Sequence, residues 1–569
     1  MVVLPSDSIA QTDSALPPAS KTSWRFGRLS AAELMPQLQR HLQEQDNTAN
    51  WQLIWLNNDG QPVICLLPKM SWCVYPVAND TQHSAKQASL YKVEKTCRAN
   101  VVPYSNTNTN TNTSDSTAAT RYMSYYDWQE ELIAYSQAYE NNNDSLLSTS
   151  QDNQPPHYHH GLIGFIGYDI AAHELSPTAN IELAEQPCAL LGHYDIYLTA
   201  DADNQNNWQL KVNIDNNNPD NSSVQQDTNA LLIALISYLD SLDNNLSNEN
   251  TNKKQLCKTL PLLLKAQWSQ QHYQQAFNQT QHYLQQGDCY QINLTQIWTE
   301  SAAGHHNKDQ TVTNLIDFLP TLHANTQAPF AGYVALDTFN NDQANTANRQ
   351  FELLSCSPEL FFTFIKDVKT GKYHIRTKPI KGTMPRGINA KQDNDYKQQL
   401  IDSEKDRAEN VMIVDLLRND LGKYAKIGSV KVPQLFAIES FSNVHHMVST
   451  ITAELKTDTH PLSVLFGSLP AGSITGTPKK RAVEVIAELE AAPRGAYCGT
   501  MGYMNFDGSG QWNVLIRTLQ ATTKSDNTKQ VSLWAGGGIT VASDCDAEYQ
   551  ECLDKVGNLL SVLANTAHH

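Results

Sequence analysis

The sequence predicts an α+β protein built on large antiparallel sheets. Apolar runs with the length of β-strands arrive in groups, and short turns join the runs within a group. Helical patterns stand between these groups instead of following every strand, and the chain contains no internal repeat. A regular alternation of strand and helix would indicate a parallel sheet, so this order of elements favours antiparallel sheets with helices between the groups of strands.

The first predicted elements are strands joined by turns. Residues 51–56 and 62–67 flank the sequence NNDG, which is a strong turn signal, so they form a predicted hairpin. The run 161–169 (GLIGFIGYD) is a predicted buried strand, and its glycines allow a neighbouring backbone to come close. A second hairpin is predicted from 190–199 and 208–214.

A helix opens the second half of the chain. Tyr273, Phe277, Thr280 and Leu284 follow the spacing i, i+4, i+7 and i+11, which places them on one helix face. Gly287 ends this predicted helix, because glycine adopts the left-handed conformation common after a helix C-terminus.

The remaining elements complete the α+β pattern. Further strands are predicted at 289–298, 330–336, 353–355, 360–365, 373–377, 502–506, 513–521 and 530–535. Helices are predicted at 395–421, at 478–489 and from about residue 547.

Asn-rich insertions interrupt the first half of the chain. The segment 105–116 (SNTNTNTNTSDS) has low complexity, and similar polar segments lie at 141–156, 204–207, 216–223 and 243–254. Such stretches bury too little apolar surface to fold alone, so we expect surface loops. Three regions are predicted: a flexible start at 1–24, an N-terminal region with the insertions at 25–255, and a region almost free of them at 265–563.

Composition excludes several classes of protein. The chain of 569 residues has 58 acidic and 41 basic residues, a formal charge of −17, which suits nucleic acid poorly. No apolar run approaches the roughly 18–20 residues that cross a bilayer, and residues 1–24 lack the pattern of a signal peptide. The ten cysteines are scattered without zinc-site spacing, which is typical of reduced thiols. We therefore expect a cytoplasmic protein that binds neither nucleic acid nor membrane.

Two helical pairs of carboxylates are candidate ligands for a cation. Asp406 and Glu409 lie three residues apart, as do Glu548 and Glu551, and Lys555 follows Glu551 by four. Residues with these spacings share a helix face. They either face water near a helix start or hold a hard cation such as Mg2+, which prefers carboxylates, waters and an anionic substrate.

Two further residues suit acid–base or nucleophilic chemistry. Glu359 precedes the apolar run 360–362, so it is either an exposed turn residue or a buried general acid with a raised pKa. Lys378 and Lys381 flank a turn. A lysine is usually a surface residue, and it becomes a nucleophile only where burial or neighbours lower its pKa.

The remaining candidates could hold an anion. Gly-rich turns are predicted at 471–479 (AGSITGTPK) and 535–539 (AGGGI), and neither has the spacing of a nucleotide-binding loop. They are either tight turns or anion-binding backbone. Arg517 stands among apolar residues, where it either pairs with an anion or reaches water from a strand edge. His446 is either a core residue or a substrate contact.

Together these motifs resemble the chorismate-utilising enzymes from about residue 271 to 563. That family includes anthranilate synthase component I, isochorismate and salicylate synthases, and aminodeoxychorismate synthase component I. The resembling stretches are GDCYQINLTQ (287–296), SPEL (357–360), PIKGTMPRG (379–387), DRAENVMIVDLLRNDLGK (406–423), VHHMVSTI (444–451), AGSITGTPKKRAVEVI (471–486), RGAYCGTMGY (494–503), VLIRTLQ (514–520), AGGGIT (535–540) and AEYQECLDKV (547–556).

The resemblance implies a fold and a set of roles. The fold would be two large antiparallel sheets in a sandwich with helices packed outside. Glu409 and Glu551 match the Mg2+ ligands, with Glu548 and Asp406 beside them, and Glu359 matches the general acid/base. The positions that match chorismate-binding residues are Gly382, Thr383, His446, Tyr497, Arg517, Gly536, Gly537, Gly538 and Lys555.

Lys381 selects a branch of the family. Most members have alanine there, whereas the aminodeoxychorismate synthases with lysine are thought to add its amine to chorismate, before ammonia replaces it. Gln291 supports this branch, because isochorismate and salicylate synthases carry a water-activating lysine there. The expected product is 4-amino-4-deoxychorismate, for 4-aminobenzoate and folate. The alternatives are an anthranilate synthase component I and a non-catalytic regulator that binds an aromatic ligand on the same fold.

The supply of ammonia requires a second protein. The chain lacks the GxCxG nucleophile elbow of a glutamine amidotransferase, so we expect a separate amidotransferase subunit to deliver ammonia. Relatives often bind tryptophan in their first half. Only Ala328-Pro329-Phe330 resembles a wall of such a pocket here, so we do not expect tryptophan binding.

Overall fold

The structure is a computed structural model. It describes residues 23–45, 52–77, 89–98, 118–142, 156–201, 207–213, 222–248, 261–300, 314–338, 348–441, 444–523 and 529–565. The predicted loop at 105–116 lies outside this described part, and so does the predicted flexible start except for residues 23 and 24. Parts of the other Asn-rich insertions, at 141–156, 204–207, 216–223 and 243–254, also lie outside it.

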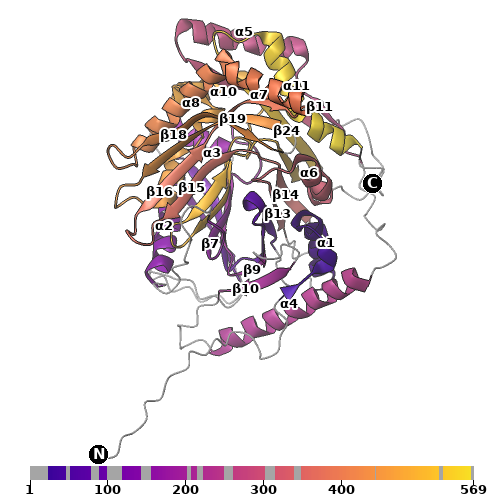
Figure 1. The fold of residues 1–569 in the computed structure, drawn as a ribbon. Helices are drawn as coiled ribbons and strands as arrows, with labels where there is room; N and C mark the ends of the chain where they lie inside the picture. Colours follow the sequence, from indigo (N-terminus) through magenta and orange to yellow (C-terminus); the bar gives the residue numbers. More distant parts are fainter. Residues whose placement is uncertain are drawn as a thin grey trace, which may run out of the picture.

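The described strands form two antiparallel sheets of 12 strands each (Figure 1). The first sheet runs in the order β1 (Ser23–Trp24), β10 (Trp208–Val212), β9 (Ile196–Ala200), β3 (Val63–Leu67), β2 (Ile54–Leu56), β13 (Gly332–Thr338), β14 (Asn348–Ser355), β23 (Thr518–Thr523), β24 (Lys529–Ile539), β12 (Gln291–Glu300) and β11 (Leu264–Ala266), with β20 (Gly476–Thr477) beside β12. The second runs β17 (Ile380–Pro385), β19 (Val444–Glu454), β16 (Tyr373–Lys378), β15 (Leu360–Lys366), β22 (Gly510–Asn513), β21 (Thr500–Asn505), β7 (Gly161–Ile166), β8 (Ala189–His193), β4 (Met70–Tyr75), β5 (Leu90–Cys97) and β6 (Ala118–Ser124), with β18 (Lys431–Ser440) beside β19.

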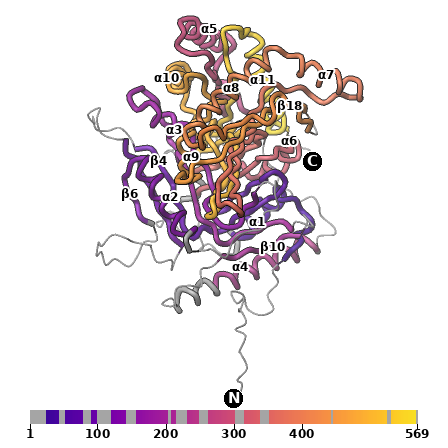
Figure 2. Tube along the Cα trace, turned by 60° about the vertical axis from the view of Figure 1, so that its left-hand side comes forward, coloured from indigo at the N-terminus to yellow at the C-terminus, as the bar shows by residue number. Residues whose placement is uncertain are grey.

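Helices cover the outer faces of the sheets, and Figure 2 shows them on the outside of the trace. The helices that share a core with the first sheet are α1 (Ala31–Gln45), α4 (Ser222–Asn248), α5 (Gln270–Gln286), α6 (Leu319–Thr326) and α11 (Cys545–Ala564). Those that share a core with the second sheet are α2 (Tyr125–Asn142), α3 (Tyr168–Leu175), α8 (Glu404–Gly422) and α9 (Pro461–Ser468). Helix α10 (Lys479–Leu489) contributes to both cores, and α7 (Ala390–Asp402) packs on β17.

A third core fills the space between the sheets. Ile163 and Phe165 of β7 pack there with residues of the first sheet such as Val334 and Phe351. The rings of Phe165 and Phe351 lie 5.6 Å apart between centroids. Burying the inner faces of both sheets in this way makes the sandwich, so the predicted α+β class with helices outside is confirmed.

Both sheets interleave strands from the two halves of the chain. Leu56 of β2 pairs with Gly332 of β13, and Gly164 of β7 pairs with Gly502 of β21. A Cβ on Gly164 would stand 1.9 Å from the carbonyl oxygen of Leu190, so the close backbone approach predicted for this strand is confirmed. The predicted regions 25–255 and 265–563 are therefore divisions of the sequence and share both sheets.

Several predicted elements end differently in the structure. The predicted helix 395–421 is two helices, because Ser403 leaves the helical conformation and its Oγ accepts the amide N–H of Asp406 at 3.2 Å, which caps α8. The predicted strand 190–199 is two strands in different sheets. The predicted strand 513–521 is likewise two strands, β22 and β23, with the chain crossing between the sheets at 514–517. The strand predicted at 161–169 ends at Ile166, and α3 begins at Tyr168.

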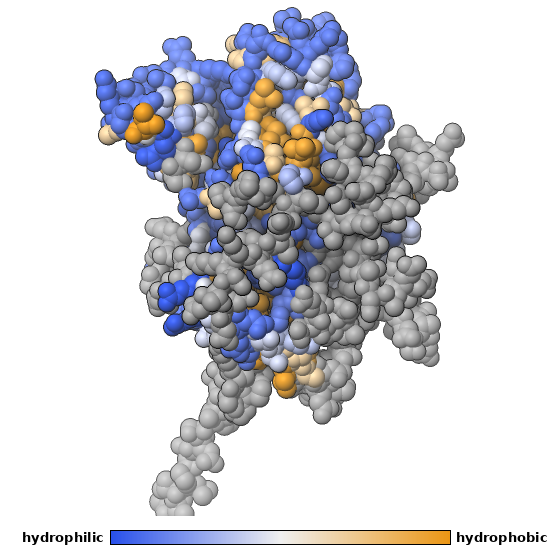
Figure 3. Space-filling model, turned by 90° about the vertical axis from the view of Figure 1, so that its right-hand side faces the viewer, coloured by the Kyte–Doolittle hydropathy of each residue, from blue (hydrophilic) through white to orange (hydrophobic). Residues whose placement is uncertain are grey.

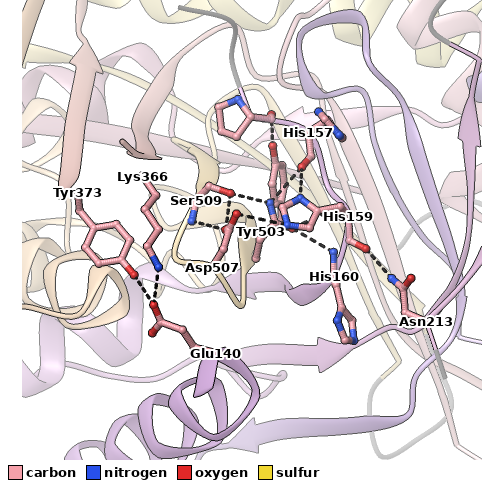
Figure 4. A network of polar contacts seen from close by, with 12 residues as sticks. Glu140, His157, His159, His160, Asn213, Lys366, Tyr373, Tyr503, Asp507 and Ser509 are labelled. Atoms are coloured by element: carbon pink, nitrogen blue, oxygen red, sulfur yellow. Dashed lines mark hydrogen bonds and ion pairs between the residues drawn. The ribbon is translucent and has the colours of Figure 1, made fainter. Parts of the chain in front are cut away.

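A polar network ties the segment before β7 to the turn after β21 (Figure 4). His159 Nε2 lies 3.4 Å from Asp507 Oδ2, and the carbonyl of His159 accepts a hydrogen bond from Asn213 Nδ2 at 2.6 Å. Nearby, Glu140 of α2 accepts hydrogen bonds from Lys366 and Tyr373, each at 2.8 Å. These contacts again join early and late parts of the chain.

The face shown in Figure 3 is largely hydrophilic over its described part, with a hydrophobic area near the top. Among the helices that the structure describes, none combines the length and the apolar character needed to cross a membrane.

Candidate active site

The predicted site residues come from elements of both sheets and from two helices. Lys381 lies on β17, His446 on β19, and the glycines 536–538 on β24. Helix α8 supplies Glu409, and α11 supplies Glu548, Glu551 and Lys555. Their mutual contacts, given below, show that the fold brings them to one place.

Lys381 occupies the centre of this group. Its Nζ lies 3.2 Å from Glu409 Oε2. A Cβ on Gly538 would stand 3.3 Å from that Nζ and 2.4 Å from Nε2 of Gln291, so the absence of a side chain at Gly538 lets β24 approach both. Gln291 itself is buried at the start of β12.

The charge around Lys381 differs from the prediction. A nucleophilic lysine requires a pocket that lowers its pKa, and burial does act in that direction. Three carboxylates, Glu409, Glu551 and Glu359, outweigh burial and raise the pKa of Lys381 above its usual value. The pocket is thus desolvated, but α8 and α11 bring acidic groups to this nitrogen, and their charges raise the pKa that burial alone would lower.

Glu359 is buried, with 6% of its surface exposed. Burial raises the pKa of its carboxyl to about 7, while a hydrogen bond from Ser473 and the charges of Lys381 and Lys555 act against burial. Its backbone is fixed, because its amide N–H donates to Ser357 Oγ at 3.2 Å and its carbonyl accepts from Val514 at 3.1 Å. The alternative of an exposed turn residue is therefore wrong, and the raised pKa suits a general acid.

Three of the four acidic side chains, Glu409, Glu548 and Glu551, come together beside β24. Glu409 and Glu548 are buried, with 8% and 1% of their surface exposed, so the alternative of water-facing carboxylates is wrong for both. A Cβ on Gly537 would stand 2.9 Å from Glu548 Oε2 and 3.8 Å from Glu551 Oε1. Asp406 instead packs against Gly382, where a Cβ would stand 2.9 Å from its Cγ.

These carboxylates can hold a hard cation. The buried Oε1 of Glu409 has no hydrogen-bond partner among the described residues, and Lys405 Nζ lies 3.9 Å from it. Partial burial raises the pKa of Glu551, whose side chain is 46% exposed, but the charges of Lys555 and Lys381 outweigh it and lower that pKa, which keeps the carboxyl ionised. No cluster of three or more His, Cys, Asp or Glu side chains in the described ranges is spaced to enclose a metal. Mg2+ needs only one or two carboxylates when water and an anionic substrate complete its shell, so Glu409 and Glu551 fit that ion.

Arg517 offers an unpaired positive charge. It lies where the chain crosses between the sheets, with φ of 51°, and its carbonyl accepts the amide N–H of Cys356 at 3.0 Å. Among the described residues its guanidinium has no hydrogen-bond or ion-pair partner, and burial lowers its pKa. The strand-edge alternative is wrong, because residues 514–517 lie between strands. A half-buried cation without an anion among the described residues is suited to an anionic ligand.

His446 faces this cation and is neutral at physiological pH. Burial and the charge of Arg517 lower the pKa of His446 to about 4. Its Nδ1 lies 2.8 Å from the hydroxyl of Thr383 on β17, which fixes the ring. The imidazole can therefore donate or accept a hydrogen bond, but it carries no charge.

The remaining predicted residues line β24 and its surroundings. Tyr497 stacks on Trp534 of β24 with 6.0 Å between ring centroids. Lys555 Nζ donates to the carbonyl of Gly536 at 2.8 Å and lies 2.6 Å from Glu551 Oε1. The predicted turn at 535–539 is wrong, since these residues belong to β24, where a Cβ on Gly536 would stand 2.1 Å from the carbonyl of Leu294.

Three side chains of this region escaped the sequence analysis. Ser473 contacts Glu359, Lys405 Nζ lies 2.9 Å from Glu548 Oε1, and Ser543 Oγ donates to the same oxygen at 2.8 Å. Lys405 stands four residues before Glu409, a spacing that could have indicated it. Ser473 lies within the AGSITG stretch, where nothing in the sequence pairs it with Glu359.

The chain is similar in sequence to known proteins. A family model described as chorismate binding enzyme matches residues 105–561. Aminodeoxychorismate synthase component 1 of Salmonella typhimurium is 37% identical over 410 residues, which are 71% of this chain and 77% of that protein. The protein of the same name from Escherichia coli is 42% identical over 295 residues, which are 52% of this chain and 58% of that relative, little more than half its length.

The solved structures show the same fold. Anthranilate synthase component I from Streptococcus pneumoniae superposes with a TM-score of 0.57 and 22% identity, covering 88% of this chain and 91% of that one. A likeness at this level of identity concerns the arrangement of the sheets and helices.

Proposed function

Because this chain belongs to the chorismate binding enzyme family, we propose that it acts as an aminodeoxychorismate synthase component 1, converting chorismate and ammonia to 4-amino-4-deoxychorismate. The observation that carries this proposal is a desolvated lysine, Lys381, placed beside a carboxyl whose pKa lies near 7. The product would serve 4-aminobenzoate and folate synthesis.

Lys381 and Glu359 divide the chemistry between them. Nζ of Lys381 would bond to C2 of chorismate as the C4–O bond breaks, and Glu359 would protonate the departing hydroxyl, which leaves as water. Ammonia would then bond to C4 as the bond between C2 and Nζ breaks and the lysine is released. In balance, one hydroxyl leaves and one amino group replaces it.

The lysine must lose its proton before it can attack. Oε2 of Glu409 lies 3.2 Å from Nζ and stabilises the protonated form of Lys381. This ion pair must therefore break, and Glu409 must pair with another cation, when the lysine loses its proton. Glu409 and Glu551, with Glu548 beside them, would hold Mg2+, which would supply positive charge for binding an anionic substrate.

The chain's own cations would hold the rest of the substrate. Arg517, whose guanidinium is unpaired among the described residues, would bind a carboxylate of chorismate. The pocket would be shaped by the glycine backbone at 536–538 of β24 and by the ring of Tyr497, which stacks on Trp534 of the same strand. Thr383 and His446 would contact the ring substituents, since their own hydrogen bond fixes both.

Ammonia would come from a separate glutamine amidotransferase subunit. The relatives are named component 1, which supports a two-component enzyme. The chain alone would then use ammonium salts and not glutamine. The nine cysteines of the described ranges are free thiols, which supports a reducing compartment such as the cytoplasm.

The deciding experiment identifies the product formed by wild type and by Lys381→Ala from chorismate, Mg2+ and ammonium. We expect 4-amino-4-deoxychorismate from wild type and a loss of roughly a hundredfold or more in the variant, because the nucleophile is gone. Lys378→Ala is the matched control, since Lys378 lies on the neighbouring strand β16 and its Nζ pairs with Glu439 at 2.6 Å.

Each other result points to a named alternative. Unchanged activity in Lys381→Ala would refute the covalent mechanism. Anthranilate as the product of wild type would identify an anthranilate synthase, and absence of chorismate turnover would favour a non-catalytic regulator.

A further inference from the structure

Lys405 reaches from the start of α8 to the carboxylates of the candidate cation site. Its Nζ donates to Glu548 Oε1 at 2.9 Å. The same Nζ lies 3.9 Å from Glu409 Oε1, the buried oxygen that has no hydrogen-bond partner among the described residues. One ammonium group therefore faces a carboxylate of α8 and a carboxylate of α11, and the proposed reaction gives this lysine no role.

The place of Lys405 within α8 is unfavourable for the helix itself. It stands two residues after the N-cap Ser403, where the helix dipole favours negative charge, and its neighbours Glu404 and Asp406 are both acidic. A lysine four residues before a glutamate is also the weaker orientation of a helical ion pair. The contact that compensates is the ion pair with Glu548, which belongs to another helix. The position of Lys405 is thus explained by the cation site and not by α8.

Each of the three carboxylates beside β24 is paired with a lysine. The pairs are Lys381 with Glu409 at 3.2 Å, Lys405 with Glu548 at 2.9 Å and Lys555 with Glu551 at 2.6 Å. The lysines already balance the negative charge of these carboxylates. A divalent cation must therefore compete with the lysines, because like charges repel.

Lys405 is the most exposed of these three lysines. Its side chain is 51% exposed, against 18% for Lys381 and 38% for Lys555. Lys555 is also held by the carbonyl of Gly536, to which its Nζ donates at 2.8 Å. The long side chain of Lys405 can instead turn into solvent, where water solvates its ammonium group. Lys405 is therefore the lysine that a metal ion would displace.

The carboxylates would stay in place when Lys405 leaves. Glu548 is buried on α11, and its Oε1 also accepts a hydrogen bond from the hydroxyl of Ser543 at 2.8 Å. Glu409 is buried on α8. A buried carboxylate that loses its cation is destabilised until another cation takes its place. Removal of Lys405 should therefore raise the affinity of these carboxylates for a metal ion.

We propose that Lys405 is a displaceable counter-ion, whose ammonium group occupies the carboxylates of Glu409 and Glu548 until Mg2+ replaces it. This inference rests on the proposed function, which assigns Mg2+ to these carboxylates. Because the metal must displace a bound ammonium group, Lys405 lowers the affinity of the free enzyme for Mg2+. The exchange adds one positive charge to the site and not two, since Lys405 leaves as Mg2+ arrives.

The test measures Mg2+ binding to the full chain by isothermal titration calorimetry, without chorismate and after EDTA treatment and dialysis. Lys405→Met removes the charge but keeps a long side chain of similar helix propensity. We expect its Kd for Mg2+ to be about tenfold lower than that of wild type, because one competing hydrogen bond to a buried charge is gone. Lys405→Arg keeps the charge and should keep the wild-type Kd.

Lys423→Met is the matched control. Lys423 follows the last residue of α8, and its side chain is 55% exposed. Its Nζ lies 3.2 Å from Oδ1 of the buried Asp420. It thus forms an ion pair of the same kind at the other end of the helix, so its loss should leave the Kd for Mg2+ unchanged.

Thermal unfolding gives a second readout. In EDTA, Lys405→Met should have a lower Tm than wild type, because the buried carboxylate of Glu548 has lost its cation. Excess MgCl2 at constant ionic strength should then raise the Tm of Lys405→Met more than that of wild type. A purely structural role of Lys405 would lower the Tm equally with and without Mg2+.

The remaining outcomes separate this inference from the proposed function. A Kd for Mg2+ that rises or stays the same in Lys405→Met would refute the exchange, and so would the absence of Mg2+ binding from both proteins. Amination of chorismate by wild type would leave the proposed function standing in either case. If the Kd and the Tm respond as expected but wild type does not aminate chorismate, the exchange stands and the proposed function is refuted.

Discussion

At the scale of single residues, burial and neighbouring groups determine the pKa of a side chain, and with it the chemical role that the side chain can take. Glu359 is a general-acid candidate because it is buried, and Ser473 with two lysines moderates its pKa. The sequence indicated Glu359 through the apolar run that follows it, since such a run buries its neighbour. It could not indicate Ser473, because that contact depends on a turn more than one hundred residues away along the chain.

The activity should therefore depend on pH through Glu359. A general acid works when protonated, so kcat should fall as pH rises through about 7, the pKa of Glu359. The Ser473 hydrogen bond lowers that pKa, so Ser473→Ala should raise it and move the alkaline limb of the kcat profile up by roughly one pH unit or less. The profile is measured with ammonium in excess.

Ser468→Ala is the control for this profile. Ser468 is buried on α9, and its hydroxyl has no partner among the described residues, so its loss should leave the limb in place. A limb that moves to lower pH in Ser473→Ala would contradict the role assigned to that hydrogen bond.

Lys381 shows the limit of sequence reasoning at this scale. Its burial could be expected from the motif, but its raised pKa comes from Glu409 and Glu551, which α8 and α11 deliver from elsewhere in the fold. The charge at a site is a property of all elements that meet there, and spacing within one motif does not reveal it.

At the scale of elements, the periodicity of apolar residues predicted most strands and helices but not where the chain changes sheets. The helix from Gln270 to Gln286 ends at Gly287, with φ of 81°, as its spacing and glycine predict. The run 513–521 is rich in apolar residues because both of its ends are buried, although in different sheets. A strand buried on both faces and a crossing between two cores have the same pattern, so this break could not be predicted.

Strand β24 brings bare backbone to the carboxylates, which gives an element-scale prediction. In Gly537→Ala the new methyl would stand 2.9 Å from Glu548 Oε2 and displace the acidic group. We expect the Mg2+ concentration for half-maximal activity to rise about tenfold, because the carboxylates lose their arrangement. Titration of activity with Mg2+ measures this.

Gly557→Ala on α11 is the matched control. A Cβ there meets nothing within 4 Å, so the Mg2+ titration should be unchanged and the helix should gain up to about 1 kcal/mol of stability. If Gly537→Ala and Gly557→Ala reached half-maximal activity at the same Mg2+ concentration, β24 would not support the cation site.

At the scale of the whole molecule, the sheets join the two halves of the chain into one structure. Antiparallel sheets could be predicted from strand groups, and the sandwich from the family resemblance. The order of strands could not, because pairings such as Leu56 with Gly332 leave no signal in a single sequence.

Because both sheets contain strands from both halves, we can predict how the two halves behave when they are expressed as separate fragments. Expressed alone, residues 1–255 should aggregate, because β7 and β2 would lack their partners β21 and β13. Co-expression with residues 256–569 should restore a soluble complex. Solubility and size-exclusion chromatography measure both outcomes, and a monomeric, cooperatively unfolding 1–255 fragment would contradict the expectation.

Ile166 pairs with Thr500, so β7 is synthesised long before its partner strand β21. At about 5–20 residues per second, a ribosome needs on the order of 20 to 70 s to make the chain between these two strands. During that interval the apolar β7 has left the ribosome and its partner does not yet exist. We therefore expect the nascent chain to depend on chaperones that hold extended apolar segments, and the sandwich to close only after translation is nearly complete.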